Sequence, residues 1–284
     1  MKLLVFGQTG QVARALARLA PDATYLGRDR ADLTDPAACA HAILQARPDA
    51  VINAAAYTAV DKAESDEATA CLVNALAPEA MAQACATLGV PLVHISTDYV
   101  FDGAGTAAFT PSAPVAPLGA YGRTKAEGEA RLRATGVVHG ILRTSWVFSP
   151  DGANFVKTML RLSETRDRLT VVGDQTGGPT PAAAIAQACL TMAARLREDA
   201  ALSGSYHFSG APETTWADFA RAIFALSGRK VDVVDIPTAD YPTPARRPLN
   251  SRLDCATTLA AFGLAQPDWH AGLRDTLTQL EVLA

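Results

Sequence analysis

The sequence predicts an α/β protein in which a doubly wound parallel sheet is followed by a smaller C-terminal α/β lobe. In the first half of the 284 residues, short apolar runs alternate with alanine-rich stretches long enough to form helices. Parallel strands are covered by helices on both faces, so they are expected to be almost continuously apolar, as these runs are. After residue 148 the alternation becomes irregular. We therefore expect one domain over residues 1–148 and mainly a second lobe over residues 149–284.

The first domain is expected to alternate strands and helices with little room for insertions. Its predicted strands are Leu3–Phe6, Thr24–Leu26, Ala50–Asn53, Leu92–Thr97 and Val138–Arg143. Its predicted helices are Val12–Leu19, Pro36–Arg47, Glu67–Leu76, Pro78–Leu88 and Tyr121–Ala134. This tight spacing predicts one compact unit.

The second part begins at a turn marked by Pro150 and Asp151-Gly152. Its predicted elements are a helix over Asn154–Ser163, a strand over Leu169–Val172, a helix over Ala182–Leu196, a strand over Ser205–Ser209 and a helix that opens near Thr215–Asp218. The stretch Pro237–Pro248 contains four prolines and two adjacent arginines. Because proline interrupts regular helix, we expect this stretch to be an ordered loop over a ligand cleft.

The composition narrows the class of protein. A hydrophobic content of 49% with 19% charged residues is ordinary for a globular protein with a sizeable core. The net charge of -4 and the lack of a Lys/Arg run predict neither nucleic acid nor an anionic membrane as a partner. No apolar run approaches the length of a membrane span. The five cysteines are scattered without a CxxC pair, which suits a reducing cytoplasm and neither a disulfide framework nor a zinc site.

A glycine turn follows the first predicted strand. Gly7 and Gly10 allow a sharp turn, and Gln11 and Val12 then open a helix. The N-terminus of a helix stabilises the negative charge of a pyrophosphate, which glycines allow to approach the backbone closely. Ala13 stands where many such turns carry a third glycine, and its small side chain still permits close helix–sheet packing. The turn predicts a dinucleotide-binding domain of Rossmann type over residues 1–148.

The end of the second predicted strand bears on the choice of cofactor. An NAD enzyme usually places a carboxylate here to bind the ribose 2′-hydroxyl, but this strand ends in Leu26-Gly27-Arg28. The guanidinium of Arg28 matches the geometry of a 2′-phosphate. Asp29 follows immediately, so NADH remains possible while NADPH is preferred.

Tyr121 and Lys125 are four residues apart on a predicted helix and therefore lie on one face. A phenol has a reference pKa of about 10. A neighbouring ammonium favours the phenolate, so we expect Lys125 to move the pKa of Tyr121 toward the working range. Together with the glycine turn, this pair predicts hydride transfer between a ketone and an alcohol.

Longer motifs give the chain a family resemblance. They are Asn53-Ala-Ala-Ala-Tyr-Thr-Ala-Val-Asp-Lys-Ala-Glu64, Ser96-Thr-Asp-Tyr-Val-Phe-Asp-Gly103, Arg143-Thr-Ser-Trp-Val-Phe148, Asn154-Phe-Val-Lys-Thr-Met-Leu160, Asp174-Gln-Thr-Gly-Gly-Pro-Thr180 and Tyr241-Pro-Thr-Pro-Ala-Arg-Arg-Pro-Leu-Asn-Ser-Arg-Leu253. In these motifs the chain resembles the dTDP-4-dehydrorhamnose reductase family of extended short-chain dehydrogenase/reductases. The resemblance runs from the first strand to beyond residue 253.

The resemblance implies NAD(P)H-dependent reduction of the 4-keto group of dTDP-4-dehydro-L-rhamnose, giving dTDP-L-rhamnose for cell-surface polysaccharide. It implies that Tyr121 donates a proton, that Lys125 bonds the nicotinamide ribose, and that Thr97 bonds the substrate oxygen. Ser96 is the alternative to Thr97, but neighbouring strand residues face opposite sides, so only one of them can serve. The second half is implied to be mainly a substrate lobe, with some segments packing back on the first domain.

The resemblance also assigns the binding residues. The cofactor is implied to contact Asp32 and Leu33 beside the adenine, and Ala55, Ala56 and Thr58 along its bridging region. The sugar is implied to contact Asp98, Tyr99 and Trp146, and its diphosphate Asn154, Arg246 and Arg247. Val60-Asp61 either lines the pocket or, through Asp61, caps the next helix.

Some relatives dimerise through a metal held by glutamates on helices. The corresponding segments here, Val12–Leu16 and Ala182–Ile185, carry no carboxylate. We therefore expect no metal, while a homodimer remains possible.

Two other functions remain open. A dehydratase or epimerase of the same superfamily usually follows the threonine with Asp-Glu, whereas Thr97 is followed by Asp98-Tyr99. A regulatory subunit of a methionine adenosyltransferase would bind a dinucleotide without turnover, which the complete Thr97, Tyr121 and Lys125 set disfavours.

Overall fold

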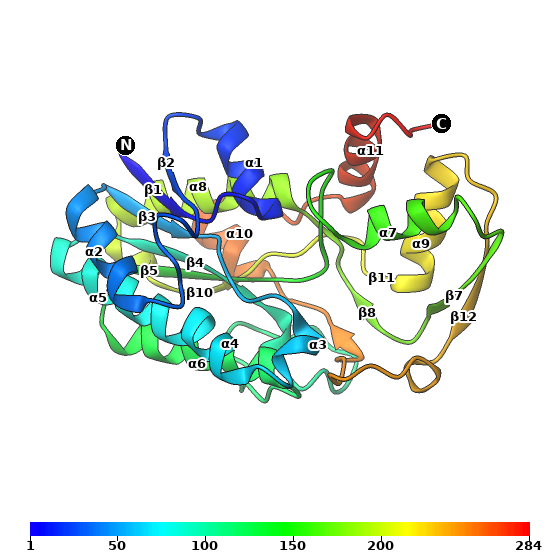
Figure 1. Cartoon of the computed structure of the whole chain (residues 1–284), viewed down its shortest axis with the longest axis horizontal. Coiled ribbons are helices and arrows are strands. Elements are labelled where there is room, and N and C mark those ends of the chain that lie inside the picture. Colours follow the sequence, from blue (N-terminus) through cyan, green and yellow to red (C-terminus); the bar gives the residue numbers. More distant parts are fainter.

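A six-stranded parallel sheet forms the centre of the larger lobe (Figure 1). The computed structural model describes residues 1–284, and its sheet has the strand order β10-β5-β4-β3-β1-β2. The strands are β1 (Leu3–Phe6), β2 (Thr24–Leu26), β3 (Ala50–Asn53), β4 (Leu92–Thr97), β5 (His139–Thr144) and β10 (Gly204–His207). This confirms the predicted doubly wound parallel sheet, with β5 displaced by one residue from its expected range.

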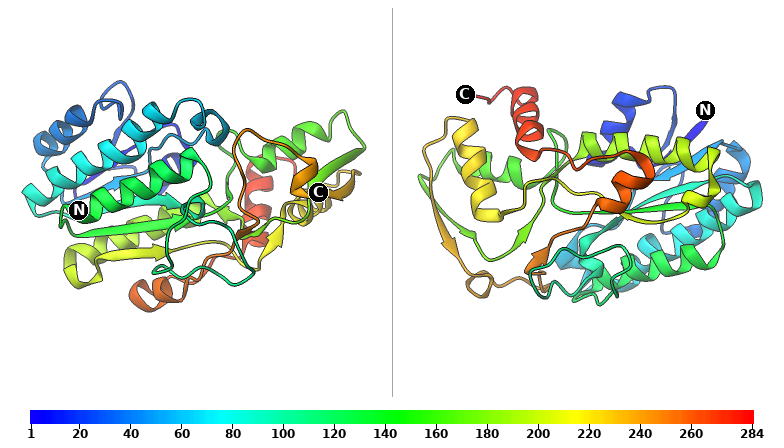
Figure 2. Two further views of the ribbon diagram at one scale, coloured as in Figure 1. Left: turned by 90° about the horizontal axis from the view of Figure 1, so that it is seen from below. Right: turned by 180° about the vertical axis from the view of Figure 1, so that it is seen from behind.

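Helices cover both faces of this sheet (Figures 1 and 2). One face is covered by α1 (Gln11–Leu19) and α8 (Ala182–Glu198), and the other by α2 (Pro36–Ala46), α5 (Ala77–Leu88) and α6 (Ala120–Ala134). Successive strand residues point to opposite faces, so Val5 packs toward α1 and α8 while Leu4 packs toward α2 and α5. Both faces are buried, which is why the strands are apolar at nearly every position.

The predicted helix over Glu67–Leu76 contains a wider turn. It consists of α4 (Glu67–Cys71) and a π-helical turn, η1 (Leu72–Leu76), which leads directly into α5. The turn places the buried Asn74 between the loop after β3 and helix α6. Its Oδ1 accepts from Tyr57 N at 2.9 Å, and its Nδ2 donates to Tyr57 O at 3.1 Å and to Thr124 Oγ1 at 3.2 Å. These side-chain bonds account for a local conformation that periodicity alone does not specify.

The smaller lobe has its own hydrophobic core, built around Phe148, Phe219 and Trp269. Its helices are α7 (Phe155–Leu162), α9 (Trp216–Leu226) and α11 (Trp269–Gln279), and its parallel strand pair is β7 (Arg168–Val172) with β12 (Asp232–Ile236). Short strands join the lobes: β6 (Val147–Phe148) pairs with β9 (Thr180–Pro181), and β8 (Thr176–Gly177) lies between β11 (Thr214–Thr215) and β13 (Asn250–Ser251).

Segments of the second half return to the larger lobe. Strand β10 pairs with β5, helix α8 packs on α1, and α10 (Ala256–Phe262) contacts both β10 and α8. The remaining short elements are α3 (Val60–Ala63), η2 (Asp98–Val100), η3 (Ala200–Leu202) and η4 (Thr238–Asp240). The division of the chain at residue 148 stays a prediction.

The proline-rich stretch Pro237–Pro248 forms a loop whose only helical element is the short turn η4. Asp61 fastens it to the larger lobe, because its carboxylate accepts from Ala245 N at 3.1 Å and from Arg247 at 2.8 Å. The stretch is therefore a loop held on the larger lobe, as its prolines predict, and its expected place over a ligand cleft stays a prediction. Among the helices of this fold, none is both long and apolar enough to cross a membrane.

Candidate active site

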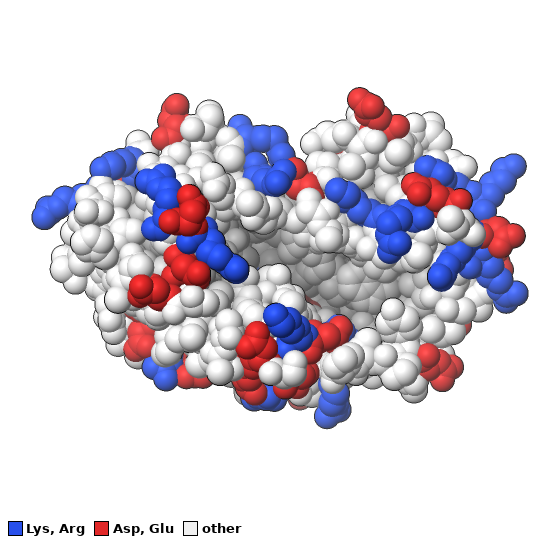
Figure 3. All heavy atoms as spheres, in the orientation of Figure 1, with Lys and Arg blue, Asp and Glu red and all other residues white.

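A cavity of about 850 Å³ lies where β1, β3, β4 and β5 end at the carboxyl edge of the sheet. Figure 3 shows the molecule hollowed between its two lobes. Ligands of open parallel sheets bind at this edge. The lining includes the following predicted residues: Gly7, Gly10, Gln11, Val12, Arg28, Asp32, Leu33, Ala55, Ala56, Thr58, Thr97, Asp98, Tyr99, Tyr121, Lys125 and Trp146.

The glycine turn has the geometry that a pyrophosphate site needs. Gly7 has a φ of 110°, and a Cβ at this position would lie 3.2 Å from the backbone C and O of Ala54. Only glycine suits such a conformation in so close an approach. Gly10 then caps α1 without any side-chain bond, and the first turn of the helix carries no carboxylate. The N–H groups of this turn can therefore bind an anionic ligand, so the residues present fit a dinucleotide.

The edge of the cavity at β2 carries both signs of charge. Arg28 and Asp29 are both exposed and both line the cavity. A Cβ on Gly27 would lie 2.6 Å from Asp29 Oδ1 and 2.6 Å from Gln8 Oε1, so these side chains cover that glycine. Sequence reasoning did not select Gln8, although it lies within the glycine turn.

Ser96 and Thr97, the two hydroxyl residues at the end of β4, point to opposite sides of the sheet. Ser96 Oγ donates to Glu129 Oε1 at 2.7 Å. Thr97 Oγ1 donates to Asp98 Oδ1 at 3.0 Å, accepts from Tyr99 N at 3.2 Å, and lies near the hydroxyl of Tyr121. Neighbouring residues of the strand face opposite sides, so the hydroxyl beside Tyr121 is that of Thr97.

Tyr121 lies in the first turn of α6, with the ring of Tyr99 edge-on at 5.5 Å between centroids. Burial raises the pKa of Tyr121 to about 12, and the nearby hydroxyl of Thr97 opposes this only partly. The expectation that Lys125 lowers the pKa of this phenol is therefore wrong for this structure. Desolvation of the phenol outweighs any attraction to the ammonium.

The side chain of Lys125 is directed toward the sheet. Its Nζ donates to Ile95 O at 2.7 Å and lies 3.1 Å from His94 Nε2. Only 1% of the residue is exposed, and burial lowers its pKa to about 8 while the charge of Glu129 opposes the shift. Sequence reasoning missed His94, which lies within the predicted strand Leu92–Thr97 and carries no sequence signal for its contact with the lysine.

A buried ion pair lies one turn further along α6. Arg143 donates to the two oxygens of Glu129 at 2.9 Å and 2.6 Å. Burial raises the pKa of Glu129, but the bonds and charge of Arg143, with a bond from Ser96, outweigh it and hold the pKa below its usual value. Arg143, the first residue of one of the family motifs, thus positions the helix that carries Tyr121.

Trp146 forms an aromatic wall of the cavity. Its ring stacks on that of Trp216, with centroids 3.7 Å apart and planes 13° apart. Its backbone has a φ of 47°, which is strained for a bulky residue and is found mostly at functional sites. Gly177 leaves space for the ring, because a Cβ there would lie 2.9 Å from Trp146 Cε2. Trp216 was not predicted, since no spacing in the sequence links it to Trp146.

Two buried polar atoms in the cavity lining have no partner within the chain. They are Oδ2 of Asp98 and Oγ1 of Thr144. Burial raises the pKa of Asp98 to about 6, and the nearby hydroxyls of Ser251 and Thr97 oppose this shift. An unpartnered buried oxygen is costly, so both atoms are suited to bind the hydroxyl groups of a ligand.

Three predicted substrate residues do not line the cavity. Asn154 caps α7: its Oδ1 accepts from Lys157 N at 3.2 Å, and its Nδ2 donates to Gln11 Oε1 at 3.0 Å and Ser149 O at 2.8 Å. Arg246 is exposed on the proline-rich loop, and the half-buried Arg247 is paired with Asp61. Asp61 therefore holds this loop, while its neighbour Val60 lines the cavity.

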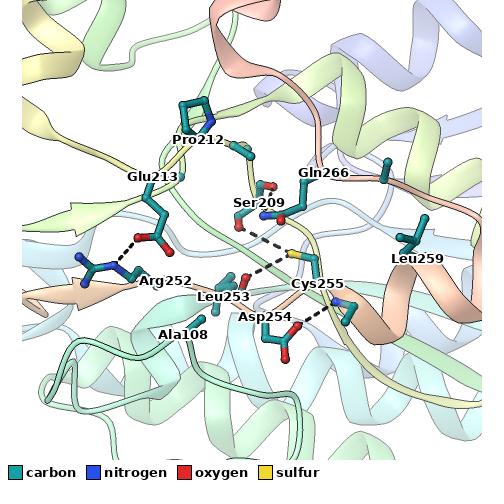
Figure 4. Close-up of a pocket in the computed structure, with 15 residues that line it drawn as sticks. Ala108, Ser209, Pro212, Glu213, Arg252, Leu253, Asp254, Cys255, Leu259 and Gln266 are labelled. Carbon is teal, nitrogen blue, oxygen red and sulfur yellow. Dashed lines mark hydrogen bonds and ion pairs between the residues drawn. The ribbon is translucent and has the colours of Figure 1, made fainter.

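A second cavity, of about 560 Å³, lies beside α10 and is lined by polar groups that bond one another (Figure 4). Arg252 donates to Glu213 at 2.6 Å, and Asp254 accepts from Ala256 N at 2.9 Å. None of the side-chain nitrogen and oxygen atoms of its lining is buried without a hydrogen-bond partner. Elsewhere, no group of three or more His, Cys, Asp and Glu side chains is placed to hold a metal ion, and the five cysteines are unpaired.

Comparisons with known proteins agree over the whole chain. A family model described as RmlD substrate binding domain matches residues 1–282. A dTDP-4-dehydrorhamnose reductase of Sinorhizobium fredii is 47% identical, over 96% of each chain. The crystal structure of such a reductase from Clostridium acetobutylicum has a TM-score of 0.92 and 35% identity, over 99% of this chain and 100% of its own. The crystal structure of another, from Bacillus anthracis in complex with NADP, has a TM-score of 0.90 and 33% identity, over 98% of this chain and 100% of its own.

The buried ion pair predicts a specific loss of stability. In Glu129→Gln the guanidinium of Arg143 stays buried without a countercharge, so we expect the free energy of unfolding to fall by about 3–5 kcal/mol at neutral pH. Glu127→Gln, which removes an exposed pair with Arg131, is the matched control and should cost less than about 1 kcal/mol. Urea unfolding measures both. Equal losses would contradict the assigned role.

The same pair predicts a pH dependence. The pKa of Glu129 is lower in the folded than in the unfolded chain, so its contribution is complete above the unfolded value of about 4.3 and is lost as pH falls through the folded value. The difference between wild type and Glu129→Gln should therefore shrink only below about pH 4.

Proposed function

The chain belongs to the dTDP-4-dehydrorhamnose reductase family, and from that premise we propose how its cavity performs the reaction. The protein is an NAD(P)H-dependent oxidoreductase that reduces the 4-keto group of dTDP-4-dehydro-L-rhamnose, giving dTDP-L-rhamnose for polysaccharide synthesis. The observation that carries the proposal is that one cavity contains both the glycine turn and the set of Thr97, Tyr121 and Lys125.

Tyr121 is the proton donor. Reduction adds a hydride to the carbonyl carbon and a proton to the carbonyl oxygen, which together make a secondary alcohol. Burial keeps the phenol protonated at neutral pH, so its O–H is available to the oxygen as negative charge develops there. The Thr97 hydroxyl lies beside Tyr121, and its single O–H turns from Asp98 to donate to the same oxygen.

The dinucleotide is held by the turn after β1, the ends of β2 and β3, and the catalytic pair. These residues are Gly7, Gly10, Gln11, Val12, Arg28, Asp32, Leu33, Ala55, Ala56, Thr58, Tyr121 and Lys125. When bound, a reduced nicotinamide supplies the hydride. NADPH is preferred because the guanidinium of Arg28 can bind a 2′-phosphate, although Asp29 beside it leaves NADH usable.

The sugar lies against Asp98, Tyr99 and Trp146. The unpartnered oxygen of Asp98 supports a bond to a sugar hydroxyl, and the indole of Trp146 offers a flat apolar face to the ring. The diphosphate is bound by Arg246 or Arg247, where an arginine suits paired phosphate oxygens. Asn154 acts at this end through Gln11 and the start of α7.

Two further features stay predictions. A cytoplasmic location is supported by five unpaired cysteines, and a homodimer is possible without a metal. Neither is needed for the chemistry described above.

Removing the proton donor should abolish most turnover. In Tyr121→Phe we expect kcat/KM to fall by about 10²–10⁴-fold, because the proposed proton donor to the carbonyl oxygen is removed, while folding stays intact. Absorbance of the reduced nicotinamide, with dTDP-4-dehydro-L-rhamnose as substrate, measures the rate. The exposed Tyr241→Phe is the control and should retain full activity. Near-normal rates in Tyr121→Phe would sink the assignment.

Cofactor preference should depend on Arg28. In Arg28→Ala we expect the affinity for NADPH to fall by about 10–100-fold, because a charge-assisted bond to the 2′-phosphate is lost, while NADH binding changes little. Arg30→Ala, an exposed arginine outside the cavity lining, should leave both unchanged. Titration of each cofactor measures the dissociation constants. Wild-type protein that binds NADH at least as tightly as NADPH rules out the preference.

The arginines of the proline-rich loop can be separated from the chemistry. If one binds the diphosphate, its change to alanine should cost about 2–4 kcal/mol, or roughly 30- to 1000-fold in kcat/KM. Reduction of a small ketone without a nucleotide should scarcely change, since that ketone never contacts the loop. Arg246→Ala and Arg247→Ala are measured separately with both substrates. Small and equal effects of both variants on both substrates show that these arginines are surface charges.

A further inference from the structure

A buried row of polar groups lies beneath the catalytic lysine. Asn53 ends β3 and is paired in register with His94 of β4, and Lys125 reaches them from α6. Asn53 Nδ2 lies 3.1 Å from His94 Nδ1, and His94 Nε2 lies 3.1 Å from Lys125 Nζ. The three residues are 1%, 0% and 1% exposed. Because the three residues are almost fully buried, their polar groups must largely satisfy one another.

One end of the row fixes the orientation of the amide. The backbone N–H of Ala55 donates to Asn53 Oδ1 at 3.1 Å, and a backbone N–H can only donate. The oxygen of Asn53 is therefore the acceptor, and its NH₂ group must face His94. Nδ1 of His94 then accepts, and a neutral imidazole with its lone pair on Nδ1 carries its proton on Nε2.

The other end of the row depends on the charge of Lys125. An N–H at His94 Nε2 needs an acceptor, and Nζ has a lone pair only as an uncharged amine. In that state Lys125 also donates to Ile95 O at 2.7 Å, and every bond in the row has one donor and one acceptor. An ammonium can only donate, so His94 Nε2 would have to accept and the ring proton would have to move to Nδ1. That proton then faces the NH₂ group of Asn53, with two donors opposed in a buried place.

We propose that His94 is a positioning residue whose tautomer is coupled to the charge of Lys125. The ring is protonated on Nε2 when the lysine is an amine and on Nδ1 when it is an ammonium. The opposed donors of the second state disfavour the ammonium, so Asn53 and His94 together set the pH at which Lys125 changes charge. Only the consequence of this coupling for turnover rests on the proposed function. The coupling itself can be observed without substrate.

The surrounding charges agree with this coupling. Burial lowers the pKa of Lys125 to about 8, and Glu129 on the same helix opposes that shift. Burial, followed by the charges of Lys125 and His139 on β5, holds the pKa of His94 well below its usual range. His94 therefore stays neutral while the lysine titrates, and only the position of its proton changes. The carboxylate of Glu129 is already paired with Arg143, which limits its pull on the lysine.

Nuclear magnetic resonance of the full chain tests the coupling directly. With ¹⁵N-labelled histidine and ¹³C-labelled lysine, we expect one transition near pH 8, shared by the His94 nitrogens and the Lys125 Cε. Above it Nε2 should carry the proton, and below it Nδ1. The signal is assigned by its loss in His94→Gln, or by through-bond correlations if that variant does not fold. A tautomer that stays fixed, an imidazolium, or separate midpoints for the two residues overturns the proposal.

An isosteric change at the far end gives a second test. In Asn53→Asp a carboxylate can accept from Nδ1, so the opposed donors disappear and the Lys125 midpoint should rise by more than one pH unit, about tenfold in proton affinity. The new charge alone also raises this midpoint. Asn53→Asp is therefore also made in the His94→Phe background, where no ring proton can move and only the new charge acts on Lys125. We expect a smaller shift there, and equal shifts in the two backgrounds refute the coupling. If these variants do not fold, the wild-type titration decides alone.

Discussion

The buried pair of Arg143 and Glu129 holds the catalytic helix against the sheet. Arg143 lies near the end of β5, Glu129 lies on α6, and Ser96 of β4 donates to the same carboxylate. One carboxylate thus ties two neighbouring strands to the helix that carries Tyr121. These buried charges are tolerated because each is hydrogen-bonded within the chain. If one partner were removed, the other would stay buried without a countercharge, and its desolvation would no longer be compensated. The position of Tyr121, the proposed proton donor, over the strand ends depends on this contact.

The same face of α6 lies in close contact with neighbouring backbone at two glycines. Gly122 and Gly128 bring α6 against the backbone carbonyls of Tyr99 and Asn74, where any side chain would collide. Tyr121, Lys125 and Glu129 follow one another at intervals of one turn, so they project from the same face toward the sheet. The first contacts the strand end, the second lies above His94, and the third binds Arg143. The pair predicted from the sequence is therefore part of a longer row, whose last member is structural.

Much of the fold follows from local patterns, and much of the site does not. Apolar runs and glycine turns predict the strands of the larger lobe to within a residue or two, because both faces of the sheet impose the same requirement on each strand. The stacking of Trp216 on Trp146 and the contact of His94 with Lys125 join positions that no spacing relates. Asn154 has the residue type of a ligand contact, but its amide caps α7 and bonds Gln11. Family motifs contain such structural residues together with catalytic ones, and only the contacts separate them.

The predicted effect of Lys125 on Tyr121 fails for a reason that applies to the whole cavity. A Coulomb argument starts from two charges, whereas burial first decides whether the charges exist. Here burial raises the pKa of Tyr121 and of Asp98 and lowers that of Lys125, so each shift favours the uncharged form. The backbone N–H groups of α1 and the exposed Arg28 supply positive charge at the dinucleotide end of the cavity, whatever the state of the catalytic pair. This positive charge favours a dinucleotide phosphate even when no catalytic group is charged. The charge of Lys125 is then set by its buried neighbours, His94 and Asn53.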